Sequence, residues 1–230
     1  MWATGQIVAP GSSATHLPGL AGPAIAAVLV TAVERGRSGL HDIAARCVMW
    51  PRMRPGVFAM ALSPFVALAG VALTTDDPAA MLRYPGLSQG IEPIAGIALV
   101  MLLNGIGEEL GWRGFAFDRL APRGRLRAAL IVAALWAVWH APLFAVHQGF
   151  AGMVGPLLLG WLAGLIAGSI VLGWLYLGTR RSVGFVAAWH VAYNYASATP
   201  RMAGVGAALV STVVTLAGLA IAWRWWRTDR

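Results

Sequence analysis

Residues 153–177 read MVGPLLLGWLAGLIAGSIVLGWLYL, a run of 25 positions without a charged side chain. A helix needs about 20 apolar residues to cross the hydrocarbon core of a bilayer, so this segment is long enough to span a membrane. Six further apolar segments emerge when charges and Pro/Gly clusters are taken as boundaries: 17–33, 56–74, 91–112, 126–146, 183–199 and 204–223. The chain is therefore predicted to be one all-α domain, residues 1–230, a polytopic membrane bundle of about seven (six to eight) transmembrane helices.

The composition of the whole chain agrees with this prediction. Of its 230 residues 58% are hydrophobic and only 11% are charged, which lies outside the range of soluble domains. The apolar segments are continuous rather than alternating, so a strand-built barrel is not expected. The single cysteine, Cys47, excludes an internal disulfide and any zinc site built on a Cys pair.

The charged residues predict an orientation in the membrane. All 17 basic residues are arginines, and 15 of them fall in the C-terminal tail or in the connections after the first, third and fifth segments. Only Arg83 and Arg201 lie in the other connections. Positively charged connections remain in the cytoplasm, so the N-terminus is predicted outside and the C-terminus inside. Because membrane insertion explains this distribution, the expected partner is the lipid bilayer and not a nucleic acid.

A glycine repeat predicts a close helix contact. Gly160, Gly164 and Gly168 repeat every four positions and share one face of their helix. Small residues at this spacing let a second helix approach closely. The contact is expected within the molecule, and the repeat does not define an oligomeric state.

Ionisable and amide side chains inside the apolar segments are few, and they fall in three of them. Such groups are costly in lipid, so each is a candidate for function. The motif core is predicted within residues 91–199, and its polar side chains with their aromatic neighbour are Asn104, Glu108, Glu109, Arg113, Trp136, His140, His190 and Asn194. Taken singly, a glutamate at a helix end or a histidine in a core has a structural explanation. Together on three helices they predict one polar pocket.

Helical spacing pairs several of these groups. Glu109 precedes Arg113 by four positions, the favourable order for an ion pair on one helix face. Asn104 and Glu108 share another face, as do His190 and Asn194, and Trp136 lies one turn before His140.

This set of groups suits hydrolysis. A carboxylate and an imidazole that converge on one water can accept its proton while it attacks a carbonyl carbon. A second histidine and a carboxamide can then donate hydrogen bonds to the oxyanion. The chain has no GxSxG or HExxH motif, so serine proteases and zincins are not indicated. Two mechanisms remain open: activation of water without a metal, or by Zn²⁺ held by Glu108, His140 and His190.

The order of these motifs resembles the CAAX protease and bacteriocin-processing family of intramembrane endopeptidases, also called the Abi family. The matching elements are EExxxR at 108–113, an aromatic residue four positions before a histidine at 136–140, and HxxxN at 190–194. The matched stretch, residues 104–194, is about 40% of the chain. Trp136 stands where the family more often has Phe.

The resemblance implies a role for each matched residue. Glu108 would activate water together with His140, while His190 and Asn194 would stabilise the oxyanion. The supporting residues would be Asn104, Glu109, Arg113 and Trp136, with the Glu109–Arg113 pair holding the site in shape. Members of the family are described both as metalloproteases and as glutamate-dependent enzymes, so Zn²⁺ remains an alternative rather than an assigned cofactor.

The depths of Glu108 and His140 set a further expectation. Glu108 lies roughly 25 Å along the third segment, near its cytoplasmic end, and His140 roughly 20 Å from the cytoplasmic start of the fourth. These depths match only if the fourth helix begins within the arginine-rich stretch. We expect the two side chains within about 10 Å of each other, in a cavity open to the cytoplasm.

The predicted function is that of an intramembrane endopeptidase in a bacterial cytoplasmic membrane. Its substrate would be a peptide, a membrane-associated protein or a prenylated CAAX-like protein. The alternative is a non-proteolytic protein on the same scaffold, such as a bacteriocin immunity or regulatory protein. A transporter with Glu108 and His140 as proton relay is less favoured, because the chain shows no internal repeat.

Overall fold

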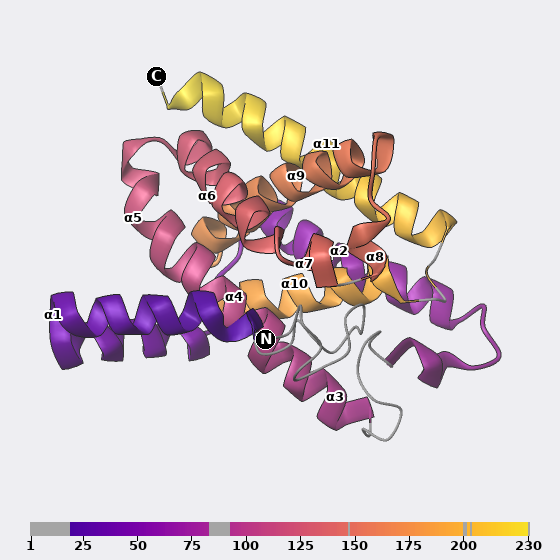
Figure 1. Ribbon diagram of the computed structural model, residues 1–230, viewed down its shortest axis with the longest axis horizontal. Coiled ribbons are helices and arrows are strands. Elements are labelled where there is room, and N and C mark those ends of the chain that lie inside the picture. Colours follow the sequence, from indigo (N-terminus) through magenta and orange to yellow (C-terminus); the bar gives the residue numbers. More distant parts are fainter. Residues whose placement is uncertain (1–18, 83–92, 147, 200–201, 203, 230) are drawn as a thin grey trace.

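The computed structural model describes residues 19–82, 93–146, 148–199, 202 and 204–229, which form helices and turns without a strand among them (Figure 1). Six helices are long and apolar enough to cross a membrane: Gly19–Val48, Pro55–Ala72, Ile94–Arg123, Arg125–Ala145, Pro156–Gly178 and Val205–Thr228. The predicted all-α polytopic membrane bundle is confirmed. Arg83, Arg201, Arg230 and the N-terminal residues that bear on the predicted orientation lie outside the described residues.

The helices follow one another in a simple order. They are α1 (Gly22–Val48), α2 (Pro55–Ala72), the short η3 (Pro78–Leu82), a compound helix described below, α6 (Arg125–His140), α7 (Leu143–Val146), α8 (Gln148–Ala151), α9 (Pro156–Gly178), α10 (Val183–Ala198) and α11 (Val205–Thr228). The start of α2, the end of the compound helix, the start of α6, the turn after α9 and the end of α11 lie at one side of the bundle, which is called the arginine end. They carry ten of the 17 arginines: Arg52, Arg54, Arg119, Arg123, Arg125, Arg127, Arg180, Arg181, Arg224 and Arg227.

The sixth predicted segment forms α10, which occupies the middle of the bundle (Figure 1). It has 16 residues, and none of its described side chains is exposed, as expected for a helix that other helices surround. Trp189 fixes it against α2, because its Nε1 donates to the Met60 carbonyl oxygen at 3.0 Å. Pro64 has no N–H to offer that carbonyl, which accepts instead from the Trp189 indole and, at 2.8 Å, from the Ser63 hydroxyl.

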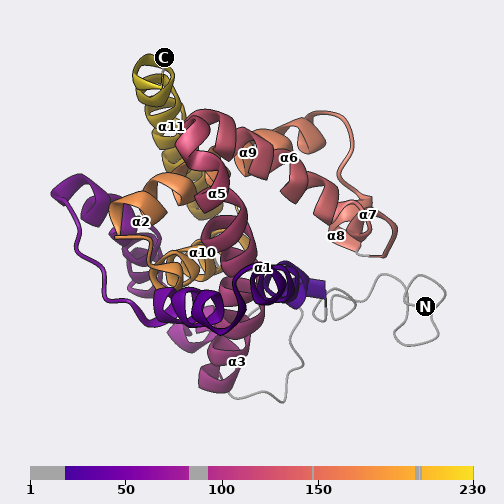
Figure 2. The same ribbon diagram turned by 90° about the vertical axis from the view of Figure 1, so that its left-hand side faces the viewer.

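The first predicted span differs from the structure. α1 continues to Val48 but breaks at Gly36, whose φ of 56° lies in the left-handed region that favours glycine. Its two halves lie side by side (Figure 2), and Arg35 NH1 donates to Asp42 Oδ2 across the turn at 3.4 Å. The arginine-rich stretch predicted as a connection is helical because Ile43 and its apolar neighbours on the same face pack back onto the core.

The helix that carries both glutamates runs from Ile94 to Arg123, well beyond its predicted end at residue 112. We call it the Glu108 helix. It consists of α3 (Pro93–Val100), the π-helix η4 (Met101–Ile106), α4 (Gly107–Glu109), the π-helix η5 (Leu110–Phe117), α5 (Asp118–Leu120) and the 3-10 turn η6 (Ala121–Arg123). The only α-helical turn between the two described π-helices holds the glutamates, and π-turns occur frequently at functional sites.

A single turn aligns the Glu108 helix with α6. Gly124, with φ of 122°, reverses the chain between them. Glu108 lies 16 residues before Gly124 and His140 lies 16 residues after it, so the two residues are at similar depth on neighbouring antiparallel helices. The depth mismatch expected from the sequence is removed mainly because the Glu108 helix is longer than predicted.

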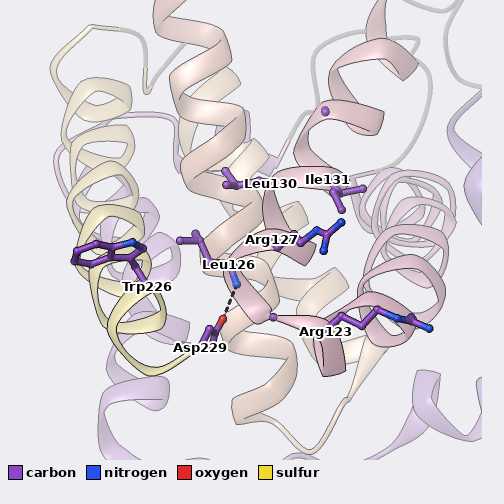
Figure 3. A pocket seen from close by; sticks show the side chains of 9 residues that line it. Arg123, Leu126, Arg127, Leu130, Ile131, Trp226 and Asp229 are labelled. Carbon is purple, nitrogen blue, oxygen red and sulfur yellow. Dashed lines mark hydrogen bonds between the residues drawn. The ribbon is translucent and has the colours of Figure 1, made fainter.

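The C-terminal end of α11 closes the arginine end of the bundle. Asp229 Oδ2 accepts a hydrogen bond of 3.1 Å from the backbone nitrogen of Leu126, in the first turn of α6 (Figure 3). Its Oδ1 accepts one of 2.7 Å from Arg125 Nε. A carboxylate from a distant segment therefore caps α6, for which Gly124 offers no side chain.

Candidate active site

Glu108 is buried in the centre of the bundle, with only 2% of its surface exposed. Its Oε1 accepts a hydrogen bond of 3.0 Å from Asn104 Nδ2, one turn earlier on the same helix. Its Oε2 accepts one of 2.7 Å from Trp136 Nε1 on α6. Two donors from two helices thus fix the plane of a carboxylate that still faces a cavity.

Glu109 forms a separate buried network. Its Oε1 lies 2.8 Å from Arg113 NH1 and 2.7 Å from His190 Nδ1, and Glu109 and Arg113 have no exposed surface. The guanidinium also stacks over the Trp136 ring, 4.6 Å from its centroid. A carboxylate held by a buried cation can orient the histidine as well, so Glu109 fixes which nitrogen of His190 turns away from it.

His140 sits at the end of α6, where the aromatic side chains of three segments surround it. Its Nδ1 lies 2.7 Å from the carbonyl oxygen of Trp136. A carbonyl only accepts, so Nδ1 carries the hydrogen and Nε2 of the neutral ring carries the lone pair. The ring stacks on Phe150 at 5.7 Å and meets Trp161 edge-on at 5.5 Å.

A relay of amides joins the third motif to the first. Asn194 Nδ2 on α10 donates to Asn104 Oδ1 at 2.7 Å, and Asn104 in turn donates to Glu108. His190, one turn earlier on α10, meets the Trp136 ring edge-on at 5.4 Å. Trp136 is thus in contact with Glu108, His140 and His190.

One cavity of about 510 Å³ brings the candidate groups together. Asn104, Glu108, Trp136, His140, His190 and Asn194 line it, whereas Glu109 and Arg113 lie behind it. The structure therefore gathers the eight residues from the Glu108 helix, α6 and α10, six at the cavity wall and two in support. Much of the remaining wall is apolar and comes from α9 and from Leu143, Phe150 and Met153 before it, while α11 contributes Ser211, Val214 and Thr215.

The arrangement of Glu108, His140 and His190 bears on whether these three side chains could hold Zn²⁺. In the part of the chain that the structure describes, no three His, Cys, Asp or Glu side chains are arranged to hold a metal ion. Both oxygens of Glu108 accept hydrogen bonds from Asn104 and Trp136, and Nδ1 of His140 and of His190 has a protein partner, so only the Nε2 atoms of the two rings remain as nitrogen ligands. As placed, these side chains do not form a three-ligand metal site.

The glycine repeat of α9 does not have the predicted role. No atom lies within 4 Å of a Cβ built on Gly160, Gly164 or Gly168, and all three line the cavity. The close helix contact is made elsewhere, by Gly218 of α11 against Ala167, where a Cβ would come within 2.9 Å. The prediction was wrong because a stripe of small residues at this spacing can pack against a second helix but can equally well line an open cavity.

The position of the cavity also departs from expectation. Its wall includes Leu143, Phe150 and Met153, which follow α6 on the side away from the arginine end, and it includes no arginine. The predicted opening toward the arginine end does not match this lining. Because the Glu108 helix continues to Arg123, Glu108 lies in the middle of this helix. The cavity extends from Glu108 toward the side of the bundle opposite the arginine end.

Several features of the site were not predicted from the sequence. The Trp136 hydrogen bond to Glu108, the Glu109 contact with His190, and the aromatic wall of Phe150 and Trp161 all join residues distant in the chain. Spacing relates residues only within one helix. Tryptophan at 136, in place of the Phe more usual in the resembling family, was the one available signal for an added donor.

The comparisons with known proteins agree with this geometry. The family model described as type II CAAX prenyl endopeptidase Rce1-like matches residues 90–196, which include every candidate residue. CAAX prenyl protease 2 of Methanococcus maripaludis is 25% identical over 212 residues, which cover 84% of this chain and 77% of that protein. Over residues 90–196 the chain is therefore similar to the Rce1-like CAAX prenyl endopeptidases.

The match to this family model, together with the similarity to the curated protease, confirms the resemblance inferred from the three motifs. It supports an endopeptidase embedded in a membrane and acting on a peptide substrate.

Proposed function

We propose that this chain is an intramembrane endopeptidase in which Glu108 and His140 activate one water for attack on a peptide carbonyl. The observation that carries the proposal is that Glu108, His140, His190 and Asn194 line one cavity. The positive-inside rule assigns the arginine end to the cytoplasm, which would put this cavity in the opposite half of the membrane.

The first step uses the two bases. Glu108 and the Nε2 atom of His140 both accept a hydrogen bond from water, and they take its proton as the new C–O bond forms. The proton then passes to the nitrogen of the scissile bond, the C–N bond breaks, and the products are a carboxylate and an amine. Asn104 and Trp136 hold Glu108 in a fixed orientation, which lowers the cost of aligning it with the substrate.

The second pair of residues suits the negative charge that develops. Glu109 occupies Nδ1 of His190, so Nε2 is the ring atom left to face the cavity, and it donates to the oxyanion when it carries a hydrogen. Asn194 uses one amide hydrogen for Asn104 and keeps a second. Two such donors aimed at a tetrahedral oxyanion lower the barrier by roughly 3–4 kcal/mol each when compared with their removal.

The substrate we propose is a peptide segment that enters the cavity in extended form. The curated relative is named a CAAX prenyl protease, and a CAAX-like or prenylated substrate is proposed for this chain on that similarity alone. The apolar side chains that α9 contributes to the wall, such as Trp161, Leu165 and Leu172, are consistent with a substrate of membrane-associated character.

Purified protein assayed with a fluorogenic peptide library tests the proposal. Glu108→Gln and His140→Ala are expected to lower turnover by about 10³-fold, while Glu34→Gln, on the exposed part of α1 far from the cavity, leaves it unchanged. A chelator added to the wild type should have no effect if the water is activated without a metal. Equal turnover by the wild type and by all the variants would refute the proposed protease mechanism.

The same proteins separate the competing functions. A binding or immunity protein would show no cleavage in the wild type under any condition. A proton-coupled transporter would show proton flux in liposomes that Glu108→Gln abolishes, without release of peptide fragments.

A further inference from the structure

A second cavity lies at the arginine end, apart from the candidate active site. It has a volume of about 600 Å³ and is formed where the start of α2, the start of α6 and the ends of α9 and α11 meet. Its lining contains four arginines from three separate segments of the chain: Arg52, Arg54, Arg125 and Arg224. No carboxylate belongs to the lining.

The charge on this cavity is largely uncompensated. Arg125 is paired with Asp229 and lies over the Trp225 ring at 5.8 Å. Arg52, Arg54 and Arg224 have no ion pair with any described residue. Arginines that share a cavity repel one another, and this repulsion destabilises the folded state. A bound anion would reduce the repulsion.

The positive-inside rule does not account for this arrangement. It requires arginines at one side of the membrane but not their convergence on one hollow. A neighbouring groove of about 590 Å³ shows the contrast (Figure 3). There Arg123 and Arg127 share the lining with Asp229, so that groove has less excess positive charge.

The apolar part of the lining identifies the class of anion. Met53, Val57, Trp174 and Leu177 face the same hollow as the arginines. Guanidinium groups bind phosphate through paired donors, and tryptophan is common where headgroups meet acyl chains. A free inorganic anion would leave these apolar side chains uncovered, whereas a phospholipid covers both parts.

We propose that the cavity lined by Arg52, Arg54, Arg125 and Arg224 binds the phosphate-bearing headgroup of an anionic phospholipid. The bound lipid would join α2, α6, α9 and α11 at the arginine end and stabilise the bundle. This site is separate from the peptidase cavity, and its proposal does not depend on the proposed protease activity.

Thermal unfolding of the detergent-purified full chain, titrated with phosphatidylglycerol or with phosphatidylcholine of the same acyl chains, tests the site. Phosphatidylglycerol should raise the Tm, and phosphatidylcholine should not. In Arg52→Gln/Arg54→Gln the apparent Kd for phosphatidylglycerol should rise about tenfold or more. Arg37→Gln/Arg227→Gln loses the same charge outside the cavity and should keep the wild-type Kd.

Three results would overturn the proposal. These are equal responses to the two lipids, equal losses in the two double variants, and an equal rise of Tm with inorganic phosphate in place of lipid. If Arg52→Gln/Arg54→Gln does not fold, the wild type remains informative. Its response to phosphatidylglycerol must weaken when NaCl is raised from about 0.1 M to 0.5 M, because screening acts on exposed arginines, and an unchanged response would count against the site.

Discussion

At the scale of single residues, the site depends on buried charges that balance one another. Glu109 and Arg113 pair as opposite charges with no exposed surface, and Glu108 and His190 beside them have 2% and 5% of their surfaces exposed. Charges without partners at such depth would be strongly unfavourable. Arg113 therefore matters for folding even though it does not reach the cavity.

Arg113→Met should destabilise the protein strongly. The substitution keeps an apolar stem but leaves Glu109 without its cation, and breaking one partner of a buried pair costs about 3–5 kcal/mol. The measurement is the thermal unfolding of the two proteins in the same detergent. Arg37→Met, at an exposed position on α1, should unfold like the wild type, and an Arg113→Met protein of wild-type stability would show that the pair is dispensable.

The residue scale is also where the sequence was most informative. Polar groups four apart on one helix, such as Asn104 with Glu108 and Glu109 with Arg113, do meet as their spacing indicated. The contact between Glu109 and His190 joins two helices whose relative rotation is set by packing. Sequence spacing contains no information on that rotation, so this part of the network required the structure.

At the scale of helices, glycines decide where the Glu108 helix meets its neighbours. A Cβ on Gly111 would lie 2.4 Å from Pro23 Cβ and 2.6 Å from the Pro23 carbonyl oxygen. The start of α1 can therefore pack against the turn after Glu109 only because position 111 has no side chain.

Gly111→Ala should destabilise the bundle by about 1–3 kcal/mol, because the backbone of α1 must shift to admit the methyl group. Gly164→Ala is the matched control, since nothing lies within 4 Å of its Cβ and alanine favours the helix by up to about 1 kcal/mol. Thermal unfolding of both variants measures the difference. Equal effects at the two positions would mean that α1 does not pack as closely as described.

Gly164→Leu should reduce activity without loss of the fold, because the new side chain projects into the candidate cavity. We expect kcat/KM for a long peptide to fall about tenfold or more. Gly70→Leu adds the same bulk on α2, where nothing lies within 4 Å, and should leave kcat/KM unchanged. Equal kcat/KM values for the two variants would place the substrate outside this cavity.

The helices show which structural features could be predicted from the sequence and which could not. The apolar segments indicated nearly all the long helices, because burial in lipid requires continuous apolar runs. The fold-back at Gly36, the two π-helices and the open glycine face of α9 depend on what packs nearby. Hydropathy predicts that a side chain is buried away from water, but it does not predict which neighbouring group packs against that side chain.

At the scale of the whole molecule, the chain end is tied to the centre of the fold. Asp229 follows α11 and caps α6, the helix that carries Trp136 and His140. Burial alone would raise the pKa of the Asp229 carboxyl, but hydrogen bonds from the Leu126 backbone and the Arg125 side chain bring its pKa below the ordinary value. The ionised carboxylate is therefore the form that stabilises the folded state.

The stability difference between the wild type and Asp229→Asn should depend on pH. A carboxyl whose pKa is lower in the folded state contributes its stabilisation above its unfolded pKa, near 3.8, and loses it as the pH falls through the folded value. The wild type should have the higher Tm at pH 5–7, and the difference should shrink below about pH 4. A difference that stays constant from pH 3 to 7 would show that the charge is not involved.

The central claim is that Glu108 and His140 act on the same water in one cavity, and a double-mutant cycle on peptide hydrolysis tests it most directly. Residues that serve a single step are strongly non-additive. If Glu108→Gln and His140→Ala each lower kcat by about 10³-fold, the double variant should be no slower than the slower single variant. A double variant slowed by the product of the two single effects would contradict a shared step, as would full activity in either single variant.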